Sequence, residues 1–407
     1  MMRGILHLAF RNVIRHRGRT LLTVASIVFG VVALILSGGF IEDTVVEVGE
    51  SMIHSNSGHL QVNRSGYAAQ GAQNLNRFII DNPAELRTKL QAIPGVKDVL
   101  LRVGFSGLLN NGKADASIIG EGVEPDREMQ LGSYLTISEG RQLKADDPFG
   151  ILVGHGVART LHLRPGDPVT LLVSTTGGAS NFLEFQVVGV FQTFSKDYDA
   201  RAVRIPLTAA RELLDTQGAH TAVVALQQTK LTTQVAERVR QDLAPAGFEL
   251  RTWIELNEFY TQTVNLYQQQ FGFLVVIILI MLLLSVSNTV NMNIYERVSE
   301  FGTMLALGNR SRFVFHLIIL EGAVLGLIGS ILGVMIGIAL ALGISAVGIP
   351  MPPPPNADLG YVSRILVVPG IVAIAFCVGW VAAVLASVLP ARKVSKMPAA
   401  EALRYGV

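Results

Sequence analysis

Four long apolar runs, unevenly spaced along the chain, constrain its fold more than any other feature. They cover residues 20–41, 271–294, 313–347 and 365–389. A helix needs about 20 apolar residues to cross the hydrocarbon core of a bilayer, and every run meets that length. A polar segment, residues 42–270, separates the first run from the other three. The layout predicts an α-helical membrane protein with four transmembrane helices and one large extramembrane domain inserted between helices 1 and 2.

Basic residues mark one side of this predicted bundle. Residues 1–19 hold five arginines, the loop 295–312 holds three, and the tail 390–407 holds four lysines and arginines. Lysine and arginine collect on the cytoplasmic side of membrane helices. We therefore expect both termini and the loop 295–312 in the cytoplasm, with the inserted domain and the loop 348–364 on the far side. The first run is longer than the apolar core of a signal peptide, about 7–15 residues, so we expect it to be retained.

Composition excludes several other classes of protein. Charged residues make up 16% of the chain, against about 25% in soluble domains, and the deficit lies in the four runs. The net charge of +2 does not suggest a nucleic-acid partner. The single cysteine, Cys377, excludes a disulfide within the chain and a metal site built from several thiolates.

The inserted segment has the pattern of a mixed α+β domain. Strands are predicted at residues 58–63, 105–109, 116–123, 151–153, 169–173, 182–191, 221–226 and 248–251, and helices at 83–93, 156–163, 206–214 and 232–243. Asn110, Asn111 and Gly112 predict a hairpin between two of these strands. The last helix, 254–270, is predicted to run without a break into the second membrane span, as a rod that would carry a domain movement to the membrane.

No motif for catalysis by this chain is present. The phosphate-binding loop of ATPases, the metalloprotease motif and the nucleophile elbow of hydrolases are all missing from the sequence. His54 and His59 are close in sequence, as are His155 and His162, but nothing signals converging metal ligands. We expect these histidines to be exposed or hydrogen-bonded, and we predict no catalytic residue, no metal site and no cofactor in this chain.

Glu321 is an acidic residue inside the third run. A carboxylate within a span is costly and is a functional candidate by default. It lies eight residues after Phe313, about 12 Å into the helix at 1.5 Å per residue. One interpretation is a structural partner for an arginine near the inner interface, which we favour because one acid makes no proton relay. The other is a role in proton or substrate movement.

A stripe of glycines follows this acid along the third run. Its members are Gly322, Gly326, Gly329, Gly333 and Gly337. At about 100° per residue they fall within an arc of about 80°, so one face of the helix is bare backbone. Bare backbone permits close approach of another helix. The stripe is either a packing surface within one chain, which we favour, or an interface that slides during a transport cycle.

Residues 293–312 predict a short amphipathic helix on the inner membrane surface. Val298, Phe301 and Leu305 form an apolar face. Glu296, Arg297 and Glu300 are placed on the remaining surface. The helix is either an interfacial anchor or a docking site for a cytoplasmic partner.

Four motifs, in order along the chain, resemble those of MacB/FtsX-type (type VII) ABC transporter permeases. GVEPDR at 122–127, with Gly140-Arg141, Pro165-Gly166-Asp167 and VVGVF at 187–191, resembles the periplasmic core domain. Glu296-Arg297, Glu300-Phe301-Gly302 and Ala306-Leu307-Gly308 resemble the coupling helix. Glu321-Gly322 resembles the third span, and LPARK at 389–393 with AAEALR at 399–404 resembles the C-terminal signature. The size and GHLQV at 58–62 are most similar to the LolC/LolE lipoprotein-releasing branch.

The resemblance implies a mechanism called mechanotransmission in the bacterial inner membrane. Two permease chains, identical or sisters, assemble with two cytoplasmic ABC ATPase subunits, which bind the ATP and Mg. Closure of the ATPases would be passed to the coupling residues, Glu296, Arg297, Glu300, Phe301, Gly302, Leu305 and Gly308. The helices would then move the periplasmic domains. Leu305 departs from the family, in which a basic residue is frequent there.

The same resemblance implies a lipidic or amphiphilic substrate, here a lipoprotein, taken from the outer leaflet or the periplasm. In the Lol branch substrate enters around the outer ends of the first two spans. Those ends carry Phe40, Ile41, Val45, Val48, Phe259, Tyr260, Phe271 and Phe273. Lipid-facing side chains would look the same. Alternative functions are an FtsX-like signalling scaffold that activates a periplasmic hydrolase, and MacB-like export of drugs or peptides through an adaptor.

Overall fold

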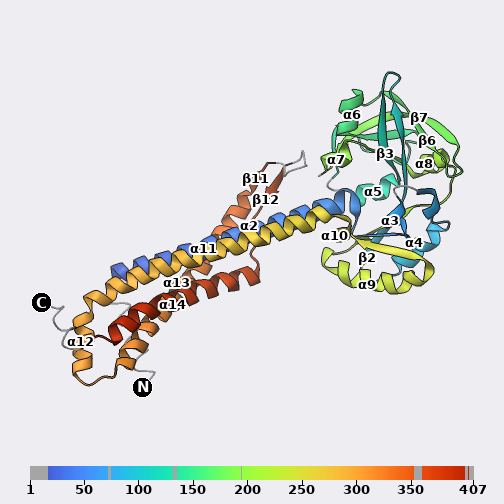
Figure 1. The fold of residues 1–407 in the computed structure, drawn as a ribbon. Coiled ribbons are helices and arrows are strands. Elements are labelled where there is room, and N and C mark those ends of the chain that lie inside the picture. Colours follow the sequence, from blue (N-terminus) through green and yellow to red (C-terminus); the bar gives the residue numbers. More distant parts are fainter. Residues whose placement is uncertain are drawn as a thin grey trace. The chain divides into compact units, whose positions relative to one another are not determined.

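The computed structural model describes residues 17–71, 75–131, 135–193, 195–352 and 360–398, together with Ala402. The chain divides into two compact units (Figure 1). The helical unit combines the described parts of Met1–Val46, Thr263–Pro350 and Val362–Val407. The inserted domain combines Glu47–Gln262 with the described part of Met351–Tyr361.

Five helices build the helical unit, and two of them begin or end in the inserted domain. They are α2 (Arg17–Met52), α11 (Glu258–Glu296), α12 (Val298–Ala306), α13 (Ser311–Val347) and α14 (Pro369–Ser395). All except α12 are long and apolar enough to cross a membrane. The prediction of four membrane helices, with a mixed α and β domain between the first and second, is confirmed. The helices α2 and α11 extend well beyond the apolar runs that predict them.

The predicted unbroken helix over residues 254–270 is wrong at its start. Thr252 and Glu255 form a capping box around the one-turn helix α10 (Trp253–Leu256). Asn257 then leaves the helical conformation, with φ −121° and ψ 76°. Its side-chain amide donates to the Trp253 carbonyl over 2.6 Å. An asparagine that bonds its neighbouring backbone competes with the helix, so α11 starts afresh at Glu258.

The glycine stripe of α13 lies against two different helices. A Cβ atom added at Gly326 would lie 2.7 Å from the Ala383 Cβ atom of α14, and one at Gly322 would overlap Ser387. A Cβ atom at Gly333 would lie 2.7 Å from the Val31 Cβ atom of α2. Gly329 and Gly337 approach Ile27 and Ile35 of α2 in the same way. The stripe is therefore a packing surface within one chain, since real Cβ atoms do not fit at these distances.

A second set of contacts ties the segment before α14 to α2 and α13. This segment begins at the last residue of β12 (Tyr361–Ser363), which pairs with β11 (Ile349–Met351) in a two-stranded sheet. The Asp43 carboxylate of α2 accepts from the Ser363 hydroxyl over 3.0 Å and from the Arg364 backbone N–H over 2.7 Å. The Ser345 hydroxyl of α13 accepts from the Ile365 N–H over 2.9 Å. Sequence reasoning singled out none of these residues.

The inserted domain holds a ten-stranded sheet in the order β10-β1-β9-β2-β3-β8-β5-β7-β4, with β6 beside β2 and β7. Its strands are β1 (Leu60–Arg64), β2 (Val96–Asn110), β3 (Asp115–Val123), β4 (Thr136–Gly140), β5 (Gly150–Gly154), β6 (Pro168–Ser174), β7 (Ser180–Gln192), β8 (Ala202–Pro206), β9 (Thr221–Leu226) and β10 (Phe248–Thr252). Its α-helices before α10 are α3 (Tyr67–Gln70), α4 (Pro83–Gln91), α5 (Pro125–Leu131), α6 (His155–Leu161), α7 (Lys196–Asp199), α8 (Leu207–Leu214) and α9 (Thr232–Leu243).

The long strand β2 joins two lobes of this domain (Figure 1). Its first part, from Val96 to Arg102, pairs with β9. Its second part, from Val103 to Asn110, pairs with β3 and partly with β6. We call the side with β10, β1, β9, α4 and α9 the β9 lobe, and the side with β3 to β8, α6 and α8 the β7 lobe. The small helix α5 belongs to the β9 lobe, because Leu131 packs with Leu100 and Val223.

Most predicted elements of the domain are confirmed, including the hairpin, in which Asn110 pairs with Asp115 and Gly112 adopts φ +84°. Two strands, β4 and β8, were not predicted, and β2 begins earlier than expected. Strand β8 has the sequence Ala-Val-Arg-Ile-Pro, and all five residues are buried. The charged Arg204 at its centre is not typical of a buried strand, so the sequence pattern does not indicate one. The predicted helix over 206–214 begins one residue later, because Pro206 still belongs to β8.

The glycine packing leads to a prediction on α13. Gly326→Leu and Gly333→Leu should each lower the thermal unfolding midpoint of the full chain in detergent, because overpacking a close helix interface costs about 1–3 kcal/mol or more. Gly343→Leu on the same helix is the matched control, since nothing lies within 4 Å of a Cβ atom there. Equal midpoints for all three variants and the parent would contradict the packing surface.

Candidate coupling site and neighbouring cavity

The short helix α12 packs into the core of the helical unit. Val298 and Phe301 are each 1% exposed and share one apolar cluster with Ile294 of α11 and Leu317 of α13. Gly308 ends this turn of the chain with φ +90°, and its N–H donates to the Leu305 carbonyl over 3.0 Å. A glycine in the left-handed region commonly follows a helix C-terminus. The apolar face of α12 is thus covered by protein.

Arg297 corrects the sequence prediction, which placed it on the exposed polar face. The residue is only 4% exposed. The reason is a break in the helix: α11 ends at Glu296, and Arg297 turns the chain with φ −106° and ψ 9° before α12 begins. Helical periodicity therefore does not run through this position, and the side chain points inward.

An ion pair joins Arg297 to the third span. Its Nη1 atom donates to both Glu321 carboxylate oxygens, over 3.0 and 3.2 Å. Its Nε atom donates to Glu300 over 3.1 Å, and its guanidinium lies 5.0 Å from the centre of the Phe301 ring. These contacts match the first interpretation of Glu321, in which it is a structural partner for an arginine. A buried charge that loses its partner costs about 3–5 kcal/mol, so the pair holds the start of α12 against α13.

The remaining residues predicted for coupling lie around this pair. Gly302 is buried, Leu305 is half-buried, and Glu296 and Gly308 are exposed. The Glu300 side chain keeps 41% exposure while it bonds Arg297. Leu307, in the turn after α12, is 80% exposed. The sequence analysis did not single out Leu307. Its position beside the turn glycine Gly308 could have indicated an exposed apolar residue.

The residues predicted for substrate access belong to both units: Phe40, Ile41, Val45, Phe271 and Phe273 to the helical unit, and Val48, Phe259 and Tyr260 to the inserted domain. Phe40, Ile41, Val45, Val48 and Phe271 are half-buried, and Phe273 is 73% exposed. In the helical unit, the Phe271 ring lies beside Gly38 of α2. In the inserted domain, the Tyr260 ring packs on Trp253 with 4.6 Å between ring centres. The side chain of Phe259 lies outside the described residues.

A cavity of about 450 Å³ lies between α2 and α11 in the helical unit. Its lining is Leu22, Ala25, Ser26, Phe29, Gly30, Ala33, Ile278, Met281, Leu282 and Ser285. The hydroxyl of Ser285 donates to that of Ser26 over 3.0 Å, so the two polar groups satisfy each other and leave an apolar surface. Cavities that hold small ligands measure about 300–1,000 Å³. Of the predicted access residues whose side chains the structure describes, none lines it. The small residues along one face of the first apolar run are the sequence feature that could have indicated this cavity.

His54 and His59 are hydrogen-bonded, and His162 is exposed. His54 Nδ1 lies 2.8 Å from the Leu131 carbonyl oxygen. His59 accepts from the Leu226 N–H over 3.2 Å. Burial lowers the pKa of His59 to about 4, so this ring is neutral near pH 7. Among the described residues, no group of three or more histidine, cysteine or acidic side chains could hold a metal ion.

Comparison with known proteins places this geometry in a family. A model of the MacB-like periplasmic core domain matches residues 20–242, and a model of the FtsX-like permease C-terminal region matches residues 272–399. An uncharacterized ABC transporter permease of Methanocaldococcus jannaschii is 25% identical over 421 residues, covering 98% of this chain and 97% of that one.

Two named relatives match at similar levels. The lipoprotein-releasing system transmembrane protein LolC of Neisseria meningitidis is 23% identical and covers 95% of this chain and 94% of its own. The macrolide export ATP-binding/permease protein MacB of Rhodospirillum rubrum is 24% identical over 98% of this chain, but over 60% of its own longer chain. The first model covers the first membrane helix and most of the inserted domain, and the second covers the last three membrane helices. The chain is a membrane protein and belongs to the MacB/FtsX-type family of ABC transporter permeases.

Proposed function

We propose that this chain is the permease subunit of a transporter that extracts or exports a lipidic or amphiphilic substrate, a lipoprotein in particular. A separate ATPase dimer supplies the energy, and ATP and Mg bind in that partner. The coupling site faces the cytoplasm, and the inserted domain faces the periplasm. A second permease copy, identical or related, completes the complex.

The observation that carries the proposal is the way in which α12 is held. Arg297 and Glu321 fix its start to α13, and Val298 and Phe301 bury its inner face. The outer turn presents Leu307 to a partner. An apolar side chain on an otherwise polar turn suits a hydrophobic socket on a protein partner. A push on this turn reaches α13 directly, because the ion pair and the apolar contacts fix the inner face of α12 to that helix.

The cavity between α2 and α11 supports a lipidic substrate. Its lining is apolar apart from the two serines that bond each other. Acyl chains need such a surface, since each buried CH₂ contributes about 0.8 kcal/mol. Relatives whose names include lipoprotein release and macrolide export both match the chain, so a macrolide-like substrate is the second candidate.

The substrate class can be tested in vesicles that contain the chain and the ATPase that co-purifies with it. A triacylated lipopeptide should raise ATP hydrolysis, and a macrolide should not. Ala33→Trp, which fills the cavity, should abolish that stimulation and leave basal hydrolysis unchanged. Ala373→Trp is the control, since Ala373 is exposed on α14 and does not line the cavity. If the macrolide raised ATP hydrolysis and the lipopeptide did not, the result would support macrolide efflux in place of lipoprotein transport.

The buried ion pair leads to a stability prediction. Glu321→Ala should lower the unfolding free energy of the full chain by about 3–5 kcal/mol, because Arg297 then lacks its buried partner. The double variant Arg297→Met, Glu321→Leu should recover most of that loss. Glu300→Ala, which removes the half-exposed partner of Arg297, should cost at most about 1 kcal/mol. If the double variant were as unstable as Glu321→Ala, the unpaired charge of Arg297 would not be the cause of the lost stability.

A further inference from the structure

The end of α2 is buried inside the inserted domain, where its carbonyl groups need partners. After Met52 the chain adds one turn of π-helix, Ile53–Ser57, and Gly58 ends it with φ +61°. Ile53, Ser55 and Ser57 are buried. The last carbonyls of a helix have no partner within it and carry partial negative charge. Buried carbonyls of this kind must be bonded by other groups.

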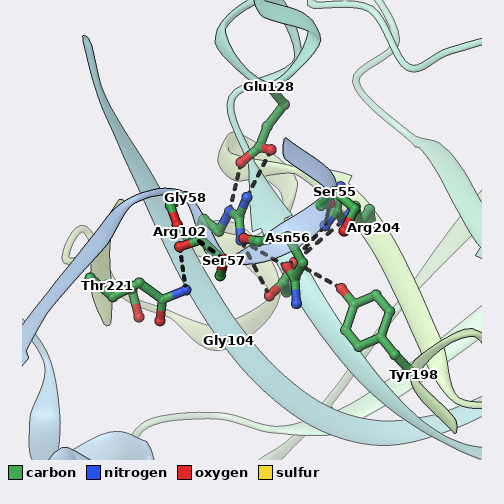
Figure 2. A network of polar contacts seen from close by, with 12 residues as sticks. Ser55, Asn56, Ser57, Gly58, Arg102, Gly104, Glu128, Tyr198, Arg204 and Thr221 are labelled. Carbon is green, nitrogen blue, oxygen red and sulfur yellow. Dashed lines mark hydrogen bonds and ion pairs between the residues drawn. The ribbon is translucent and has the colours of Figure 1, made fainter. Parts of the chain in front are cut away.

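Two buried arginines supply those bonds (Figure 2). Arg102 of β2 donates from Nη1 to the Asn56 backbone carbonyl over 2.6 Å and to the Asn56 side-chain oxygen over 2.9 Å. Arg204 of β8 donates from Nη2 to the Ser55 carbonyl over 3.2 Å and to the same Asn56 side-chain oxygen over 3.1 Å. Each arginine is 3% exposed. The Asn56 Oδ1 atom is thus shared by both guanidinium groups.

Each arginine is held in place by a carboxylate of its own lobe. Arg102 forms a two-bond pair with Glu128 of α5, over 2.6 and 2.9 Å. Arg204 lies 3.3 Å from Glu121 of β3, which also accepts from the Tyr198 hydroxyl over 3.0 Å. Burial would raise the pKa of Glu121, but Arg102 and Arg204 outweigh it and hold that pKa below its usual range. Two positive and two negative groups therefore balance around Asn56.

The two arginines belong to different lobes. Arg102 lies on the part of β2 that pairs with Thr221 of β9, and Glu128 lies on α5 of the same lobe. Arg204 and Glu121 face each other across the parallel strands β8 and β3 of the β7 lobe. Asn56 joins the two lobes through one side-chain oxygen. A helix that ends between two lobes, bonded to both, can set their relative position.

Other contacts connect α2 to the β9 lobe alone. The Thr229 hydroxyl donates to the Glu50 carboxylate of α2 over 2.6 Å. The Trp253 ring lies against Gly49. Strand β1 of the same lobe begins at Leu60, two residues after Gly58. The β9 lobe therefore has several links to α2, whereas Arg204 gives the β7 lobe its polar link through Asn56 and Ser55.

We propose that Asn56, Arg102 and Arg204 form a helix-end clamp that joins α2 to the β7 lobe and lets a movement of α2 reposition that lobe against the β9 lobe. The use of the clamp rests on the proposed function, in which α2 moves during the transport cycle. The clamp itself is a property of the chain alone. Asn56 acts in it as a positioning residue.

The test measures distances between spin labels in the full chain without an ATPase, in nanodiscs and with Cys377→Ser as background. One pair joins Glu47 of α2 to Lys113 of the β7 lobe, and the other joins Glu47 to Glu237 of the β9 lobe. Asn56→Ala should broaden the first distance distribution and leave the second narrow. Asn56→Asp, which keeps two oxygens for the arginines, should leave both narrow.

Controls keep this test decisive. Asn181→Ala removes a half-buried amide that bonds the Leu213 carbonyl within the β7 lobe, so it should leave both distributions narrow. Asn56→Gln, which removes no polar group but displaces the oxygen, should act like Asn56→Ala if the alanine variant does not fold. A Glu47–Lys113 distribution as narrow as the parent's in Asn56→Ala, or in Asn56→Gln if the alanine variant does not fold, would overturn the clamp. Because no ATPase is present, this outcome is separate from a failure of ATP coupling.

Discussion

A buried charge needs a partner, and the position of α12 depends on that constraint. Arg297 is removed from solvent where α11 ends, and Glu321 of α13 neutralises it. Neither residue can leave the apolar core alone without exposing the other to an unfavourable environment. The pair therefore fixes where α12 begins and which face it turns outward. The exposed turn at Leu307 is a consequence of that arrangement.

Helix α2 depends on two different kinds of contact along its length. In the helical unit it packs against the bare backbone of α13, where Gly333 and Gly337 leave room for Val31 and Ile35. In the inserted domain its end is bonded by Arg102 and Arg204. The first contact depends on shape and the second on charge. Because α2 continues from Met52 into the π-helical turn Ile53–Ser57, both act on one continuous helix.

Local patterns in the sequence were sufficient for much of this architecture. The apolar runs predict the four membrane helices because length and hydrophobicity decide insertion. The glycine stripe predicts a close interface because the 3.6-residue period places its members on one face. The interpretation of Glu321 as a partner of an arginine also follows from local reasoning, since a lone acid within a span needs a counter-charge.

The remaining features depend on contacts between distant segments. The inward turn of Arg297 follows from a helix break that no proline or glycine marks. Strand β8 escaped prediction because Arg204 at its centre is typical of an exposed strand, whereas Glu121 and Asn56 bond it in the interior. The break at Asn257 depends on a side-chain bond to Trp253. The cavity between α2 and α11 needs two helices that are far apart in sequence.

The central claim, that the turn after α12 receives the ATPase, is tested most directly by co-purification of the full chain with that partner. Leu307→Asp should reduce the amount of bound ATPase, because a carboxylate in an apolar socket loses its hydration without gaining a partner. Leu307→Met, which keeps an apolar side chain of similar size, should retain parental binding. Full recovery of the ATPase with Leu307→Asp would contradict the account.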